Sequence, residues 1–181
     1  ILAQLSTDDV TDFEELLAQR NYSQALSYAR ALNSRQQPES IEKAHSRLLL
    51  SRAFQENRQF DKAEKILDSL LHENQFLHFP NLLTETWFQK GILSDSQNRE
   101  ATAVNYFLKV DSMTNGGNIT PRLQTRALTA IGDLLFQWRY MKIASGYSKP
   151  SHFYGKALKV AEQTGDSTAW YSLKLRLAFL A

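Results

Sequence analysis

The sequence predicts an all-α protein, an α-solenoid in which antiparallel helix pairs stack on one another. Three observations lead to this prediction. Only 7 Gly and 4 Pro occur among 181 residues, too few turn residues for a many-stranded β protein. Apolar residues recur three and four positions apart, as in Phe60, Ala63, Ile66 and Leu67, which is the period of an amphipathic helix. Related strings return every 38 to 42 residues, which is typical of a helical repeat.

About nine helices are expected. The first, near 7–19, can be capped by Ser6 or Thr7, because their hydroxyl groups accept hydrogen bonds from unpaired amides. The next, near 23–35, and two others near 60–74 and 99–113 complete the pairs. Each proline suits the first turn of a helix, where its missing amide hydrogen does no harm. The helices that this rule places follow Pro38, Pro80, Pro121 and Pro150. Gly165 and Asp166 separate the eighth helix from the last.

The repeat is visible in both helices of each pair. Second helices open with RNYSQALSYARAL at Arg20, RQFDKAEKILDSL at Arg58 and NREATAVNYFLKV at Asn98. In the first helices, one phase is occupied at spacings of 40, 41 and 42 by Arg47, Trp87, Leu128 and Trp170. Four residues later in each come Ser51, Gly91, Gly132 and Lys174.

The two glycines predict close helix contacts. Glycine inside a helix costs roughly 1 kcal/mol relative to alanine, so Gly91 and Gly132 need a structural reason. We expect a second helix to approach each of them closely, with small residues such as Ala63 and Ala103 on the opposing surface.

Trp87 with Gly91, Ala103 and Phe107, then Leu128 with Ile131, Gly132 and Leu135, and the string YGKALKVAEQTGD at 154–166 resemble the tetratricopeptide repeat. The period is similar to the variant of about 40 residues found in bacterial regulators and signalling proteins. The resemblance implies a right-handed superhelix formed by a single domain, residues 1–181. Its units would be 8–36, 44–74, 84–114, 121–165 and the start of a further unit at 167–181, and we expect the chain to be a fragment of a longer protein.

The resemblance also implies a concave groove lined by first helices. The residues expected to face a partner there are His45, Leu48, Arg52, Gln55, Glu85, Phe88, Ile92, Asp95, Arg126, Thr129, Asp133 and Phe136. An insertion of about six residues in the fourth unit adds a second candidate site, formed by Trp138, Arg139, Tyr140 and Lys142. Such residues can stack on bases or bind an acidic partner. The alternative is a lengthened helix whose aromatic residues pack on the next pair.

Composition and motifs argue against catalysis. The chain has no cysteine, which excludes a disulfide scaffold and a thiol nucleophile. It has no glycine-rich phosphate loop and no H-E-x-x-H motif. Glu42 and His45 form one E-x-x-H, but a di-metal helical bundle needs a second copy and two further glutamates. We therefore expect no enzyme activity, no metal and no cofactor.

The function expected is a protein interaction scaffold or sensor module of a bacterial regulatory or signalling protein, binding a peptide or a partner's helix in its groove. The residues with which family members bind a C-terminal carboxylate are not reproduced, and apolar Leu48, Phe88, Ile92 and Phe136 favour an amphipathic helix. Self-association through the C-terminal helix, which looks truncated, is an alternative partner choice.

Charge suggests a second function. The net charge of +2 argues against a general polyanion binder, but residues 120–181 hold 9 Lys and Arg against 3 Asp and Glu. Nucleic-acid binding through this basic third is therefore the alternative to a protein partner.

An enzyme built on helices is a third hypothesis, which the missing catalytic set opposes. No segment is long and apolar enough to span a membrane, and cytoplasmic and exported locations, the latter after removal of a signal, both stay open.

Overall fold

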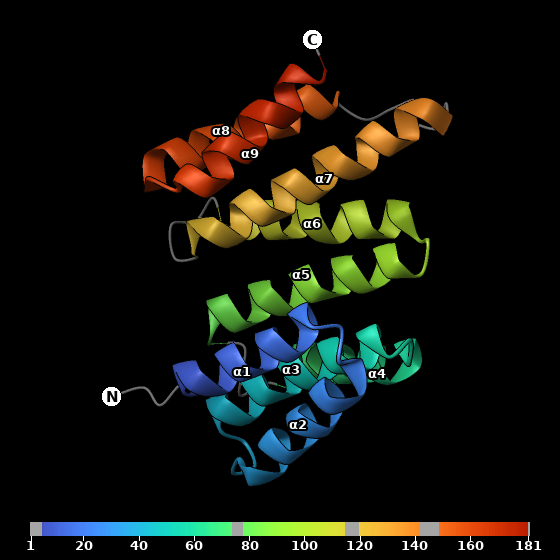
Figure 1. Cartoon of the computed structure of the whole chain (residues 1–181), viewed down its shortest axis with the longest axis vertical. Helices are drawn as coiled ribbons and strands as arrows, with labels where there is room; N and C mark the ends of the chain where they lie inside the picture. Colours follow the sequence, from blue (N-terminus) through green and yellow to red (C-terminus); the bar gives the residue numbers. More distant parts are fainter. Residues whose placement is uncertain (1–4, 74–77, 115–119, 142–148, 181) are drawn as a thin grey trace. The chain divides into compact units, whose positions relative to one another are not determined.

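The computed structural model describes the backbone of residues 5–73, 78–114, 120–141 and 149–180, and the side chains of all of these except 138–141. Over these ranges the chain forms nine helices and no strand (Figure 1). They are α1 (Thr7–Ala18), α2 (Tyr22–Arg35), α3 (Ile41–Glu56), α4 (Phe60–His72), α5 (Pro80–Ser96), α6 (Glu100–Thr114), α7 (Pro121–Met141), α8 (Pro150–Thr164) and α9 (Ser167–Ala178). The all-α class and the order of the predicted helices are confirmed.

Side chains with hydrogen-bond acceptors set several helix starts. The hydroxyl of Ser6 accepts a 3.0 Å hydrogen bond from the amide of Asp9, so Ser6 is the cap of α1. The carboxylate of Asp166 accepts a 2.9 Å bond from the amide of Ala169 and caps α9. Gly165, just before it, ends α8 in the left-handed conformation at φ 68°. The predicted break between α8 and α9 is therefore confirmed.

Three of the four prolines begin helices as predicted, and one does not. Pro80, Pro121 and Pro150 are the first residues of α5, α7 and α8. The prediction for Pro38 is wrong, because Glu39 next to it has a φ of 67°, which no right-handed helix can accommodate. The hydroxyl of Ser40 caps the helix instead, and α3 begins only at Ile41.

The repeat is also present in the backbone of the turns. Arg20, Arg58 and Asn98, the first residues of the three related strings, have positive φ values of 56°, 57° and 56°. After Arg58, the amide of Gln59 donates a 2.8 Å bond to the carbonyl of Phe54, and the equivalent bond follows Arg20. This closure is the Schellman motif. The recurring strings thus correspond to recurring turn geometry.

The chain divides into two compact units, Ile1–Gln97 and Asn98–Ala181. The predicted unit 84–114 has its first helix in one and its second helix in the other, and the single domain over 1–181 stays a prediction. In the first unit each helix packs on the next, and α3 also packs on α5. Buried residues occur nearly all around α3, among them Ala44, Leu48, Ser51 and Phe54. A helix with this distribution is an inner helix of its unit.

In the second unit, α6 packs on α7, α7 on α8 and α8 on α9, with the most extensive contact between α7 and α8. Leu128, Ile131 and Leu135 of α7 are fully buried there, as is Ala157 of α8. Packing therefore follows sequence order within each unit, as the antiparallel pairs predicted. Within the described part of the chain, no helix combines the length and the hydrophobicity needed to cross a membrane.

The close approach predicted at Gly132 is present, but its partner is different. A Cβ atom added to Gly132 would lie 2.6 Å from Cδ1 and 2.9 Å from Cζ of Tyr154 on α8, and nearer still to Cε1. The glycine therefore accommodates an aromatic ring and not the small residue that we expected. Ser51 and Gly91, which share its position in the repeat, are also buried, whereas Lys174 in the last helix is exposed.

Candidate functional site

Several residues of the predicted groove are packed inside the first unit. Leu48 on α3 and Phe88 on α5 are buried, and their side chains offer little surface to a partner. Gln55 is buried too, and its amide donates a 3.0 Å bond to the hydroxyl of Ser96. These three residues hold α3 and α5 within their unit.

Arg52 is engaged in contacts with α1. Its Nη2 donates a 3.0 Å hydrogen bond to Oε2 of Glu14, and its Nη1 contacts Oε1 of the same carboxylate. The guanidinium carbon also lies 5.5 Å from the centre of the Phe13 ring, a cation–π distance. A bidentate ion pair of this kind positions two helices, so Arg52 has a structural role between α1 and α3.

His45, Glu85, Ile92 and Asp95 keep more surface. His45 is half-buried, and burial lowers the pKa of its imidazole below the ordinary value. The charges of Glu42 and Glu85 oppose this shift, which shows that α3 and α5 bring these groups near one another. Ile92 is half-buried and Asp95 is exposed. These four residues could meet a partner, and their role stays a prediction.

In the second unit, Asp133 is the centre of a polar contact between three helices. Its Oδ1 accepts a 2.7 Å bond from the hydroxyl of Tyr154 on α8 and a 2.8 Å bond from Nε of Arg176 on α9. Burial and this hydrogen bond raise the pKa of Tyr154, and the bond to Asp133 raises that of Arg176. Asp133 therefore joins α7, α8 and α9.

The other predicted residues of α7 have different exposures. Arg126 is exposed, whereas Thr129 and Phe136 are half-buried. The hydroxyl of Thr129 donates a 2.8 Å bond to the carbonyl of Thr125 within the same helix. The insertion candidates Trp138, Arg139, Tyr140 and Lys142 lie outside the residues whose side chains the structure describes.

The clearest exposed apolar surface was not among the predicted site residues. Across the described residues, the large apolar side chains that are exposed all lie on α9 or its C-terminal cap: Tyr171 at 70%, Leu175 at 61% and Phe179 at 77% of full exposure. The amide of Phe179 donates to the carbonyl of Leu175, so the helical turn continues through it. Residues four apart share one side of a helix. We call these three residues the α9 stripe.

The α9 stripe lies opposite the face by which α9 packs. Leu173 is buried, and Leu175, two residues later, is turned from it by about 200° around the helix. Trp170 and Leu177 on the inner side are half-buried. α9 is thus apolar on two sides, of which only one is covered by described residues.

The repeat phase extends to two residues of this surface. In the alignment that matches Trp170 with Leu128, Tyr171 follows Leu48, Phe88 and Thr129, and Leu175 follows Arg52, Ile92 and Asp133. Tyr171 and Leu175 therefore continue the predicted partner-facing positions into the predicted repeat unit 167–181, whereas Phe179 has no counterpart among them. The groove residues predicted from the sequence ended in the fourth repeat unit. The apolar residues four apart in WYSLKLRLAFL were the signal that could have extended them into α9.

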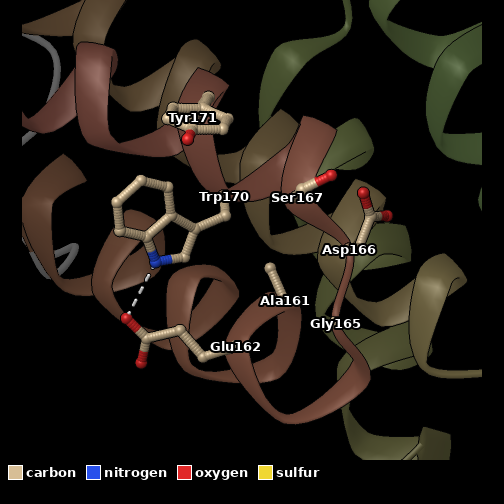
Figure 2. Close-up of a pocket in the computed structure, with 7 residues that line it drawn as sticks. All are labelled: Ala161, Glu162, Gly165, Asp166, Ser167, Trp170 and Tyr171. Carbon is tan, nitrogen blue, oxygen red and sulfur yellow. Dashed lines mark hydrogen bonds between the residues drawn. The ribbon is translucent and has the colours of Figure 1, made fainter.

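A surface hollow of about 360 Å³ adjoins the stripe at the start of α9. Its lining consists of Ala161, Glu162, Gly165, Asp166, Ser167, Trp170 and Tyr171. Figure 2 shows the indole of Trp170 turned toward Glu162, whose Oε1 accepts a 3.0 Å bond from its Nε1. Tyr171 belongs to both the hollow and the stripe, so the two features form one continuous surface.

The described residues contain no group of three or more His, Asp or Glu side chains placed to hold a metal ion. A scan against protein-family models and a search of the curated proteins found no match for this chain.

Proposed function

We propose that the protein is an interaction module that binds a helix of a partner protein through the α9 stripe. The observation that carries this proposal is the concentration of exposed large apolar side chains, among described residues, at Tyr171, Leu175 and Phe179. A contiguous exposed apolar patch is typical of an interaction site. Three anchors spaced by four residues match the spacing with which amphipathic helices pack.

The character of α9 supports the same conclusion. α3 shows what an inner helix of this chain looks like, because its apolar residues are covered on several sides by neighbouring helices. α9 carries apolar residues on two sides as α3 does, yet its outer side is exposed over the described residues. Covering that side with another helix would remove three large side chains from water, which is the dominant favourable term in association.

Site-specific photo-crosslinking tests the proposal. The photoreactive residue p-benzoylphenylalanine would replace Tyr171 in one variant and the exposed Gln163 of α8 in a matched control. We expect a discrete protein adduct from position 171 that is absent from position 163. Adding Leu175→Asp should abolish this adduct, because a charge in the centre of the stripe opposes apolar burial. Equal adducts from both positions, or an adduct insensitive to Leu175→Asp, would contradict the proposal.

The same variants distinguish a protein partner from nucleic acid. Residues 98–181 contain 11 Lys and Arg against 5 Asp and Glu, which favours some attraction for polyanions. Binding of a single-stranded oligonucleotide that falls steeply with salt and does not respond to Leu175→Asp would support the nucleic-acid function in place of the protein-binding one.

A further inference from the structure

We infer that the helix bound by the α9 stripe is acidic, with Asp or Glu side chains flanking its apolar face. This inference rests on the proposed function and adds the chemistry of the partner. It depends on the charges around the stripe, on how they are neutralised, and on the size of the stripe.

The charges beside the stripe are cationic. Between Ser167 and Ala181 the chain has Lys174 and Arg176 and no Asp or Glu. Lys174 is three residues after Tyr171 and next to Leu175, so it lies along the edge of the stripe. It is exposed, and its ammonium lies 5.1 Å from the centre of the Trp170 ring. No carboxylate of the described residues pairs with it, which leaves its charge available to a partner.

The acidic side chains of the second unit are largely committed to internal contacts. Asp133 pairs with Arg176, and Asp111 pairs with Lys156. The carboxylate of Glu162 accepts from Trp170, and that of Asp166 caps α9. Of the two cations on α9, Arg176 is offset by Asp133, whereas Lys174 at the edge of the stripe has no carboxylate partner among the described residues. A partner helix with negative side chains along this edge is therefore favoured.

A second copy of this chain fits the stripe less well. If two α9 helices packed around a twofold axis at Leu175, the edge that carries Lys174 on one helix would lie against the same edge of the other helix. The two Lys174 ammonium groups would then be close together. The stripe also spans only nine residues, about 12 Å of helix from Tyr171 to Phe179, whereas a stable dimer buries about 800 Å² on each partner. A short helix with three apolar anchors matches this length better.

Three synthetic helical peptides of equal length test the inference. They share apolar residues at positions i, i+4 and i+8 and differ only in the flanking residues, which are Glu, Gln or Lys. Fluorescence anisotropy with the full chain measures each affinity. We expect the Glu peptide to bind about fivefold more tightly than the Gln peptide at low salt, and the Lys peptide more weakly still. The difference should shrink at high salt because ions screen exposed charges.

Two variants separate charge from apolar contact. Lys174→Glu should remove the preference for the Glu peptide, whereas the exposed Lys65→Glu on α4, which changes the net charge equally, should preserve it. Leu175→Asp should abolish binding of all three peptides.

The outcomes distinguish the inference from the proposed function. If all three peptides bind equally and Leu175→Asp abolishes their binding, the acidic partner is wrong and the helix-binding function stands. Binding that Lys174→Glu leaves unchanged would likewise contradict the inference alone. If sedimentation shows a dimer that Leu175→Asp disperses, the occupant is a second copy. If no peptide binds and the chain is monomeric, helix binding at this surface is itself contradicted.

Discussion

Replacing individual glycines by alanine provides the sharpest test of the packing in the second unit, because the same substitution should destabilise the protein at two positions and stabilise it at a third. At Gly132 the new methyl group would overlap the ring of Tyr154, with Cδ1 at 2.6 Å and Cζ at 2.9 Å. At Gly155, within α8, no atom lies within 4 Å of the new methyl group. Gly165 is in open space as well, but its φ is 68°.

The expected magnitudes follow from these surroundings. Overpacking a core costs about 1 to 3 kcal/mol, and the Tyr154 ring cannot yield easily because it is buried and its hydroxyl bonds to Asp133. Alanine returns about 1 kcal/mol of helix propensity, which leaves Gly132→Ala destabilised by up to about 2 kcal/mol. Gly155→Ala receives that propensity gain without overlap and should be about 0.5 to 1 kcal/mol more stable. Gly165→Ala should lose about 1 kcal/mol, because a side chain disfavours the left-handed conformation.

Urea denaturation followed by circular dichroism measures all three free energies of unfolding. Removing the ring in the Tyr154→Ala background provides the decisive control, since Gly132→Ala should then stabilise the protein. A Gly132→Ala variant at least as stable as the parent protein would refute the close approach of α7 and α8. A cost that persists without the Tyr154 ring would show that the overlap is not its cause.

Three further predictions concern single side chains. The pKa of His45 is lowered by burial, so its protonation favours unfolding and stability should fall as pH drops below about 6.5. His45→Gln should flatten this part of the profile in pH-dependent melts. Arg58 has a φ of 57°, so Arg58→Gly should gain up to about 1 kcal/mol, whereas Arg58→Ala should gain nothing in the same denaturation assay. The buried carboxylate of Asp111 accepts from Gln124 at 3.0 Å and from Lys156 at 2.6 Å. Asp111→Ala should therefore cost about 1 to 3 kcal/mol, and Asp111→Asn less; equal costs would contradict a role for the bond from Gln124.

Many features of the fold could be predicted because they depend on neighbours along the chain. The serine cap at Ser6, the prolines that begin α5, α7 and α8, and the break at Gly165 are local effects of hydrogen bonding and backbone conformation. The expectation for Pro38 failed where two local signals competed, since the positive φ of Glu39 and the cap at Ser40 place the helix start three residues later.

The surface could be predicted only in part. The position of Leu48 and Arg52 in the repeat predicted that both face a partner. Neighbouring helices instead bury Leu48 and supply Glu14 as the ion-pair partner of Arg52. Phase continued into α9 would have included Tyr171 and Leu175. Their exposure could not be inferred from phase, because it depends on which sides of α9 other helices cover.

The sequence by itself determined where most helices begin and end, how they pair with their neighbours, and that Gly132 marks a close approach, because these follow from spacing and backbone chemistry within a few turns. Only the tertiary structure decided that Tyr154 is the group approaching Gly132, that Asp133 joins three helices, and that the α9 stripe is exposed. Such contacts join residues far apart in the chain, and their partners depend on how whole helices are oriented against one another.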